Sequence, residues 1–199
     1  MNFIRRSIFS LAFILSASSI FALELKSDDL NYTFTISGTW TVTFQNQAGF
    51  LIASPDGKKT ISLLIGNAKS GQLDPSSIAQ YEQEYEQVMN KAVAQKVSSK
   101  MFTVDGVPAY EFIQRVGKAP YATVTVFHEI VANNKLYTLG STIAGGDSSQ
   151  DSEMQDGLAS FHFLQQPKPS RFNFFGVKLT VAGVIVAGIV FWVIRSRKI

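Results

Sequence analysis

The chain has 199 residues, of which 46% are hydrophobic, with 18 Lys and Arg against 15 Asp and Glu. The isoelectric point near 9.1 suggests a nucleic-acid binder, but the basic excess lies at the two ends. Two basic residues precede the first apolar run and five flank or enter the last, which leaves 11 basic against all 15 acidic residues between them, a net charge of −4. A surface that binds phosphate groups needs a positive charge, so nucleic acid is excluded as a partner.

Residues 1–22 have the three parts of a secretory signal peptide. Arg5 and Arg6 precede a short apolar run, and small residues follow it. Cleavage after Ala22 and cleavage after Ser19 both fit the pattern. An uncleaved anchor is the alternative, although the run is too short to span a bilayer comfortably.

The first part of the domain that follows is predicted to contain four strands. Alternating apolar and polar residues indicate two half-buried strands, at 31–36 and 40–44. Two denser apolar runs, 50–53 and 61–65, are predicted to be strands covered on both faces, joined by a Pro-Asp-Gly turn.

A helix is predicted over 74–92, because Asp74 can cap it and Pro75 suits its first turn. Tyr81 and Tyr85 fall on its apolar stripe. Aromatic residues at helical spacing usually pack into the core, and the alternative is that the pair faces a ligand.

An antiparallel meander is predicted next, with strands at 101–104, 109–116, 121–131 and 136–143, and with tight turns at Asp105-Gly106 and at Asn133-Asn134. A short helix at 154–161 and a last strand at 161–164 would close the domain. The acidic residues between 147 and 156 lack the spacing of a calcium loop and fit a solvated helix start better. We therefore expect no metal and no cofactor.

The chain has two histidines and no cysteine. His128 shares a strand face with Val124, Val126 and Ile130, where a lone histidine is more often a hydrogen-bonded core group than a catalyst. His162 is expected to point outward. Because no nucleophile, base and acid set is apparent, we expect no enzyme, and the candidate ligand-binding residues are Tyr81, Tyr85 and His128.

The carboxyl end is predicted to anchor the protein. Residues 166–173 form a proline-containing tether, and 174–194 are apolar on all sides apart from Lys178, long enough for a single transmembrane helix. The basic tail 195–199 should stay in the cytoplasm. The domain at 23–165 would then be extracytoplasmic, in the periplasm of a Gram-negative cell, with the lipid bilayer as one partner.

Several landmarks resemble the PsbP-like domain family. They are a Gly-Thr-Trp opening, Gly-Phe with Ser-Pro-Asp-Gly, the run Ile-Ser-Leu-Leu-Ile, Asp-Gly-Val-Pro-Ala-Tyr-Glu-Phe, Asn-Lys-Leu-Tyr-Thr-Leu and Ala-Ser-Phe-His-Phe (38–40, 49–57, 61–65, 105–112, 134–139 and 159–163). The resemblance implies an α+β fold, an α/β/α sandwich around a central antiparallel sheet, and a noncatalytic role in assembling or stabilising a larger complex.

The function expected from the sequence is therefore a membrane-anchored module that binds or stabilises an envelope protein complex. One alternative is a binder or carrier of a lipid or another apolar small molecule, held between helix and sheet near the two tyrosines. Another is a hydrolase that uses His128, for which the sequence names no substrate.

Overall fold

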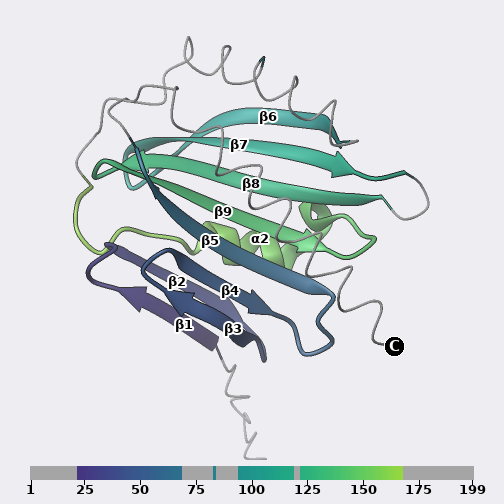
Figure 1. Ribbon diagram of the computed structural model, residues 1–199, viewed down its shortest axis with the longest axis horizontal. Helices are drawn as coiled ribbons and strands as arrows, with labels where there is room; N and C mark the ends of the chain where they lie inside the picture. Colours follow the sequence, from purple (N-terminus) through teal and green to yellow (C-terminus); the bar gives the residue numbers. More distant parts are fainter. Residues whose placement is uncertain (1–21, 69–82, 84–93, 119–121, 168–199) are drawn as a thin grey trace, which may run out of the picture.

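The computed structural model describes residues 22–68, 83, 94–118 and 122–167. Most of this part of the chain is antiparallel sheet (Figure 1). In chain order its elements are β1 (Ala22–Ser27), β2 (Tyr32–Ser37), β3 (Thr41–Asn46), β4 (Gly49–Ala53), β5 (Lys59–Asn67), β6 (Ala94–Val104), β7 (Val107–Val116), β8 (Thr123–Ala132), β9 (Lys135–Ile143), the 3-10 helix η1 (Ser148–Gln150) and α2 (Ser152–Ala159).

Seven strands form the main sheet, in the order β3-β4-β5-β9-β8-β7-β6, and β1 pairs with β2 in a separate ribbon. The meander follows from two tight turns. Asp105 and Gly106 have φ angles of 49° and 79°, and Asn133 and Asn134 have φ angles of 54° and 58°. Gly and Asn tolerate this left-handed conformation best, so both predicted hairpin turns are confirmed.

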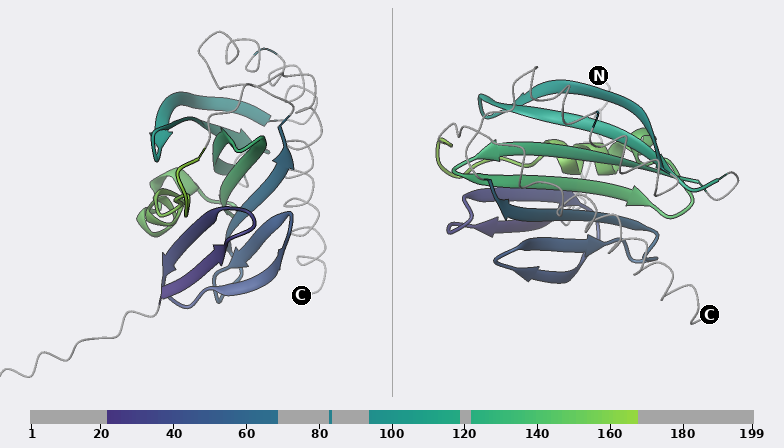
Figure 2. Two further views of the ribbon diagram at one scale, coloured as in Figure 1. Left: turned by 90° about the vertical axis from the view of Figure 1, so that its left-hand side faces the viewer. Right: turned by 45° about the horizontal axis from the view of Figure 1, so that its top comes forward.

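The main sheet curves, and both α2 and the β1–β2 ribbon lie on its concave side (Figure 2). Side chains from the ribbon, the sheet, α2 and the segment after it form one buried core there, which includes Tyr32, Phe34, Ile36, Phe50, Ile61, Leu63, Tyr137, Leu139, Met154, Leu158 and Phe161. Gly157 lets α2 approach closely, since a Cβ on it would lie 3.1 Å from the terminal methyls of Ile36 and Ile61. Burial of this apolar surface is the main stabilising contribution.

The opposite side of the sheet carries a short row of aromatic residues. The rings of Phe112 and Phe127 stack at 4.9 Å, and Tyr110 lies 6.1 Å from Phe112. All three are at most 3% exposed. Phe127 also covers Gly140, where a Cβ would lie 3.0 Å from the ring.

The predicted α+β class and the central antiparallel sheet are confirmed. In the described part of the chain, α2 is the α-helix that covers the sheet, and it does so on one side. The helix predicted over 74–92 lies outside the described residues apart from Gln83, so the second helical layer of an α/β/α sandwich stays a prediction. No helix within the described ranges is long and apolar enough to cross a membrane, and the span predicted at 174–194 lies outside them.

Four details differ from the sequence predictions. The second predicted strand is β3, at the edge of the sheet, but it begins after Trp40 and all six of its residues are exposed rather than half-buried. β1 was not predicted, and β6 begins seven residues before the predicted strand at 101–104. The predicted last strand is a single bridge between His162 and Thr33.

Candidate functional site

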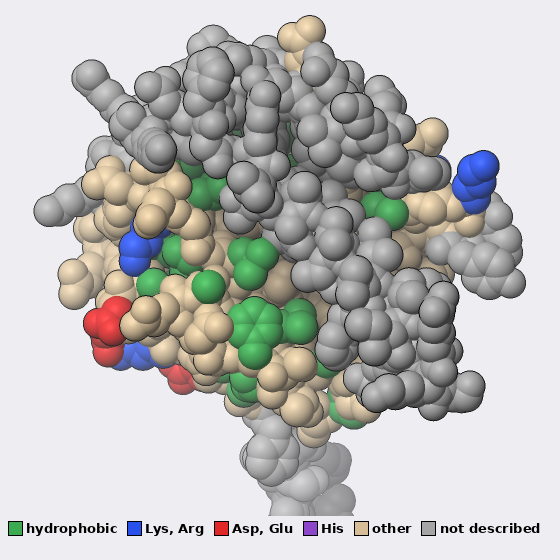
Figure 3. Space-filling model, viewed as in Figure 1, with side chains coloured by type: hydrophobic (Ala, Val, Ile, Leu, Met, Phe, Trp, Pro, Cys, Tyr) green, Lys and Arg blue, Asp and Glu red, His purple; other side chains and the backbone are tan. Residues whose placement is uncertain are grey.

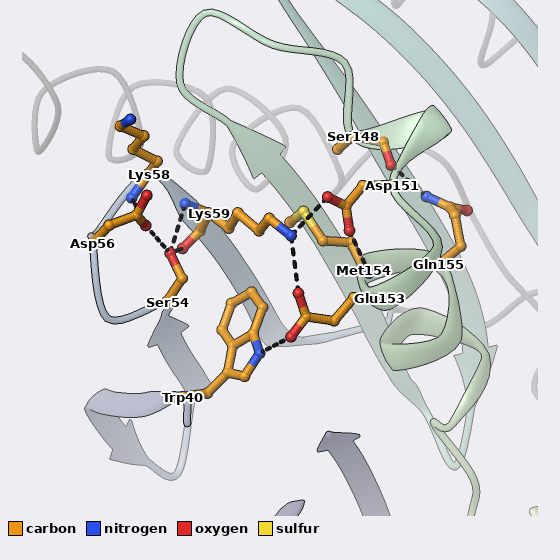
Figure 4. Close-up of polar contacts among 10 residues, drawn as sticks. All are labelled: Trp40, Ser54, Asp56, Lys58, Lys59, Ser148, Asp151, Glu153, Met154 and Gln155. Carbon is orange, nitrogen blue, oxygen red and sulfur yellow. Dashed lines mark hydrogen bonds and ion pairs between the residues drawn. The ribbon is translucent and has the colours of Figure 1, made fainter. Parts of the chain in front are cut away.

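The first polar cluster joins α2 to the edge half of the sheet. The ammonium of Lys59, the first residue of β5, lies 2.7 Å from Asp151 Oδ2 and 2.9 Å from Glu153 Oε2 (Figure 4). Trp40 Nε1 donates a hydrogen bond of 3.0 Å to the other oxygen of Glu153. Trp40 is one of the landmarks of the family resemblance, whereas no pattern in the sequence predicts a role for Lys59.

The charges of this cluster stabilise one another. The hydrogen bonds from Lys59 to Asp151 and Glu153 raise the pKa of Lys59 above its ordinary value. Burial of Asp151 tends to raise its pKa, but the hydrogen bonds from Lys59 and from the N–H of Met154 outweigh burial, so the pKa is lowered. The raised pKa of Lys59 and the lowered pKa of Asp151 both favour the charged forms, so this pair is ionised at neutral pH.

Two aspartates of the acidic stretch between 147 and 156 are helix caps. Asp147 accepts a hydrogen bond from the N–H of Ser149 and begins η1, while Asp151 accepts one from the N–H of Met154 and begins α2. No group of three potential metal ligands lies together in the described ranges. The cap that Asp151 makes at the start of α2 confirms the predicted helix start.

The second polar cluster lies on the concave side, across β6, β7 and β8. Lys100 stands opposite Glu111, and Glu111 opposite His128. The two oxygens of Glu111 contact different partners, His128 Nε2 at 3.0 Å and Lys100 Nζ at 3.1 Å. The hydrogen bond from His128 lowers the pKa of Glu111, burial opposes this, and Lys100 adds to the lowering.

His128 is buried, as the core interpretation predicts, and Phe102 packs against it with ring centroids 4.7 Å apart. Its hydrogen-bond partner could have been found in the sequence through the predicted turn. Lys100 lies five positions before Asp105, and Glu111 lies five after Gly106, so the hairpin brings these two opposite charges together. The neighbouring strand then adds His128.

The other two candidate ligand-binding residues, Tyr81 and Tyr85, lie outside the described residues. Their grouping with His128 therefore stays a prediction. His162 points outward as expected, with its side chain 58% exposed, and its Nδ1 lies 3.0 Å from Asp105 Oδ1.

Asp105 and Asn31 hold the segment after α2 in place. Asp105 Oδ2 accepts a hydrogen bond of 2.7 Å from the N–H of Phe163. Asn31 donates to the C=O of Gln165 and accepts from its N–H. These contacts orient the chain as it leaves the domain towards the predicted tether.

Several solved structures have a fold similar to that of this chain, although no family model and no curated protein matches its sequence. The cyanobacterial PsbP protein CyanoP from Synechocystis sp. PCC 6803 superposes with a TM-score of 0.54 at 13% identity, over 74% of this chain and 95% of that one. The chain has a PsbP-like fold. The Ran-binding protein Mog1p from Saccharomyces cerevisiae matches at a TM-score of 0.50 and 9% identity, over 74% of this chain and 97% of Mog1p. At these identities the likeness concerns the PsbP-like fold alone.

Proposed function

We propose that this chain is a membrane-anchored, extracytoplasmic PsbP-like module that is not catalytic and that binds or stabilises an envelope protein complex. The observation that carries the proposal is that the polar side chains of the two clusters contact one another. Lys59 contacts both Asp151 and Glu153, and Glu111 contacts both Lys100 and His128. Such closed networks stabilise a scaffold, whereas a catalytic group must also reach its substrate.

The membrane anchoring in this proposal rests on the sequence. The apolar span at 174–194 and the basic tail at 195–199 favour a single-pass protein with the domain outside the cytoplasm. The hydrogen bond from the N–H of Gln165 to Asn31 fixes the end of the domain next to the predicted tether, which supports a domain that is held close to the tether. In a protein of this design the fold presents a binding surface at a fixed position over the bilayer.

The test is the composition of the native membrane species. The full chain, affinity-tagged and solubilised in mild detergent after in-cell crosslinking, should be recovered with a different envelope protein in a defined ratio. A matched version that lacks 23–165 but keeps both ends should lose that protein. Recovery of this chain alone, or only with copies of itself, would contradict the proposal.

The second candidate is a carrier of a lipid or another apolar molecule. It is favoured by the aromatic row of Tyr110, Phe112 and Phe127, because aromatic side chains commonly line apolar ligand sites. Mass spectrometry of the protein purified from native membranes should then find one bound lipid class. The hydrolase hypothesis is tested separately. A hydrolytic activity that is unchanged in the His128→Ala variant would contradict it.

A further inference from the structure

The described strands differ in how their open edges are protected. The edge strand β6 of the main sheet carries Lys96 and Lys100, and β1 of the ribbon carries Glu24 and Lys26. β3, the other edge of the main sheet, has no charged residue. Charged side chains on edge strands are a common device against pairing with another chain.

β3 also lies in an unusually neutral stretch of sequence. The 26 residues between Asp29 and Asp56 contain no charge. All six residues of β3 are exposed, including Val42 at 38% and Phe44 at 37%. Figure 3 shows hydrophobic side chains gathered over β3–β5, with the visible charged side chains at the margins. The protective feature that β3 does have is a bulge between Val42 and Phe44, and β6 has one as well.

We propose that two copies of this chain associate through β3, which pairs antiparallel with β3 of the second copy about a two-fold axis at Phe44. Self-pairing suits this edge because it is neutral. Two copies of β6 would bring lysines together, whereas two copies of β3 bring no like charges together. The contact uses the same patch on both partners, so it closes after two copies.

The register follows from the geometry of an antiparallel pair. Successive residues turn their N–H and C=O groups to opposite sides of the strand. With the axis at Phe44, Gln45 of each copy lies opposite Thr43 of the other, which is the residue at the bulge of β3. The two Phe44 side chains then lie side by side on one face of the joined sheets, and each removes the other's exposed ring from water.

The absence of cysteine makes a direct crosslinking test possible. Directly opposed residues in a non-hydrogen-bonded antiparallel pair have Cα atoms about 4.5 Å apart, within disulfide range. Phe44→Cys in the full chain should therefore give a disulfide dimer in native membranes under mild oxidation. The matched control is Met101→Cys on β6, an edge residue of similar exposure at 40%.

A second pair of variants tests the non-covalent dimer. Phe44→Lys places two lysines opposite each other and removes the aromatic contact, so we expect the dimer dissociation constant of the detergent-solubilised chain to rise about tenfold. Met101→Lys should leave it unchanged.

The proposal is supported by a disulfide dimer at position 44 with none at 101, together with a dimer that only Phe44→Lys weakens. A monomeric wild-type chain, equal crosslinking at both positions, or a dimer that resists Phe44→Lys would overturn it. Circular dichroism of each variant establishes that it is folded. The outcome is independent of the proposed envelope partner, which would appear as a different protein in the same preparation.

Discussion

Trp40 and Glu153 lie 113 positions apart in the chain, yet the indole N–H of Trp40 donates a hydrogen bond of 3.0 Å to the Glu153 carboxylate. The other oxygen of that carboxylate contacts Lys59. One acidic side chain in the first turn of α2 thus ties the helix to the residue before β3 and to the start of β5. The stability of the domain should depend on this contact.

Lys59→Met should lower the free energy of unfolding by about 1–2 kcal/mol, a range reduced for the partial exposure of the three charges. The variant removes the cation from between Asp151 and Glu153 and leaves the two carboxylates facing each other. Urea unfolding at pH 7 measures the loss. Lys58→Met, at the exposed neighbouring position, is the control and should change stability by less than about 0.5 kcal/mol.

Stability should fall in acid because two carboxyl groups have lowered pKa values in the folded state. Glu111 and Asp151 have ordinary values of 4.5 and 3.8, and both are lowered. A lowered pKa contributes stability that is fully present above the ordinary value and is lost as the pH falls through the folded-state value. Glu111→Gln should therefore be less stable than wild type at pH 7 and lose less stability between pH 6 and pH 3. Equal losses in both proteins would contradict the assignment.

Gly49→Ala should be among the most damaging single substitutions. Gly49 has a φ of +125°, and a Cβ there would lie within van der Waals overlap of the Leu63 carbonyl oxygen. We expect a loss of at least about 3 kcal/mol. Gly106→Ala is the control, because Gly106 also has a positive φ but has open space around it, and should cost about 1–2 kcal/mol. Comparing the thermal unfolding of the two variants separates the cost of the steric overlap from the cost of the positive φ angle.

Asp105→Asn should loosen the segment after α2. The substitution removes the charge that accepts from Phe163 N–H and pairs with His162, while asparagine still suits the turn. Hydrogen exchange of residues 161–166 should become about tenfold faster, as the loss of one charge-assisted hydrogen bond implies. Asp28→Asn, in the exposed turn of the β1–β2 ribbon, should leave that exchange rate unchanged.

The mature amino terminus should lie at Ile20. Ala22 is the first residue of β1 and stands opposite Ser37, so cleavage after Ala22 would shorten β1 whereas cleavage after Ser19 leaves it whole. Amino-terminal sequencing of the membrane-bound protein decides between them. A start at Leu23 would show that the outermost pair of the ribbon is dispensable.

The sequence by itself determined the features that depend on neighbouring residues. Asp105-Gly106 and Asn133-Asn134 predicted their hairpins because these residues accept positive φ, and the alternation at 31–36 predicted β2 because strand side chains alternate between two faces. The same local rules placed α2 and the buried position of His128. They also led to the antiparallel meander, whereas the PsbP-like fold was expected from the resemblance of the landmark motifs to that family.

The tertiary structure alone decided which strand is an edge and which distant charges meet. The residues of β3 alternate like those of a half-buried strand, but in the folded protein β3 is an edge strand and all six of its residues are exposed. Lys59 carries no local sign of its partners, since Asp151 and Glu153 reach it only when α2 packs across the sheet. Periodicity reports the conformation of a segment, whereas burial and charge pairing depend on what the rest of the chain places beside it.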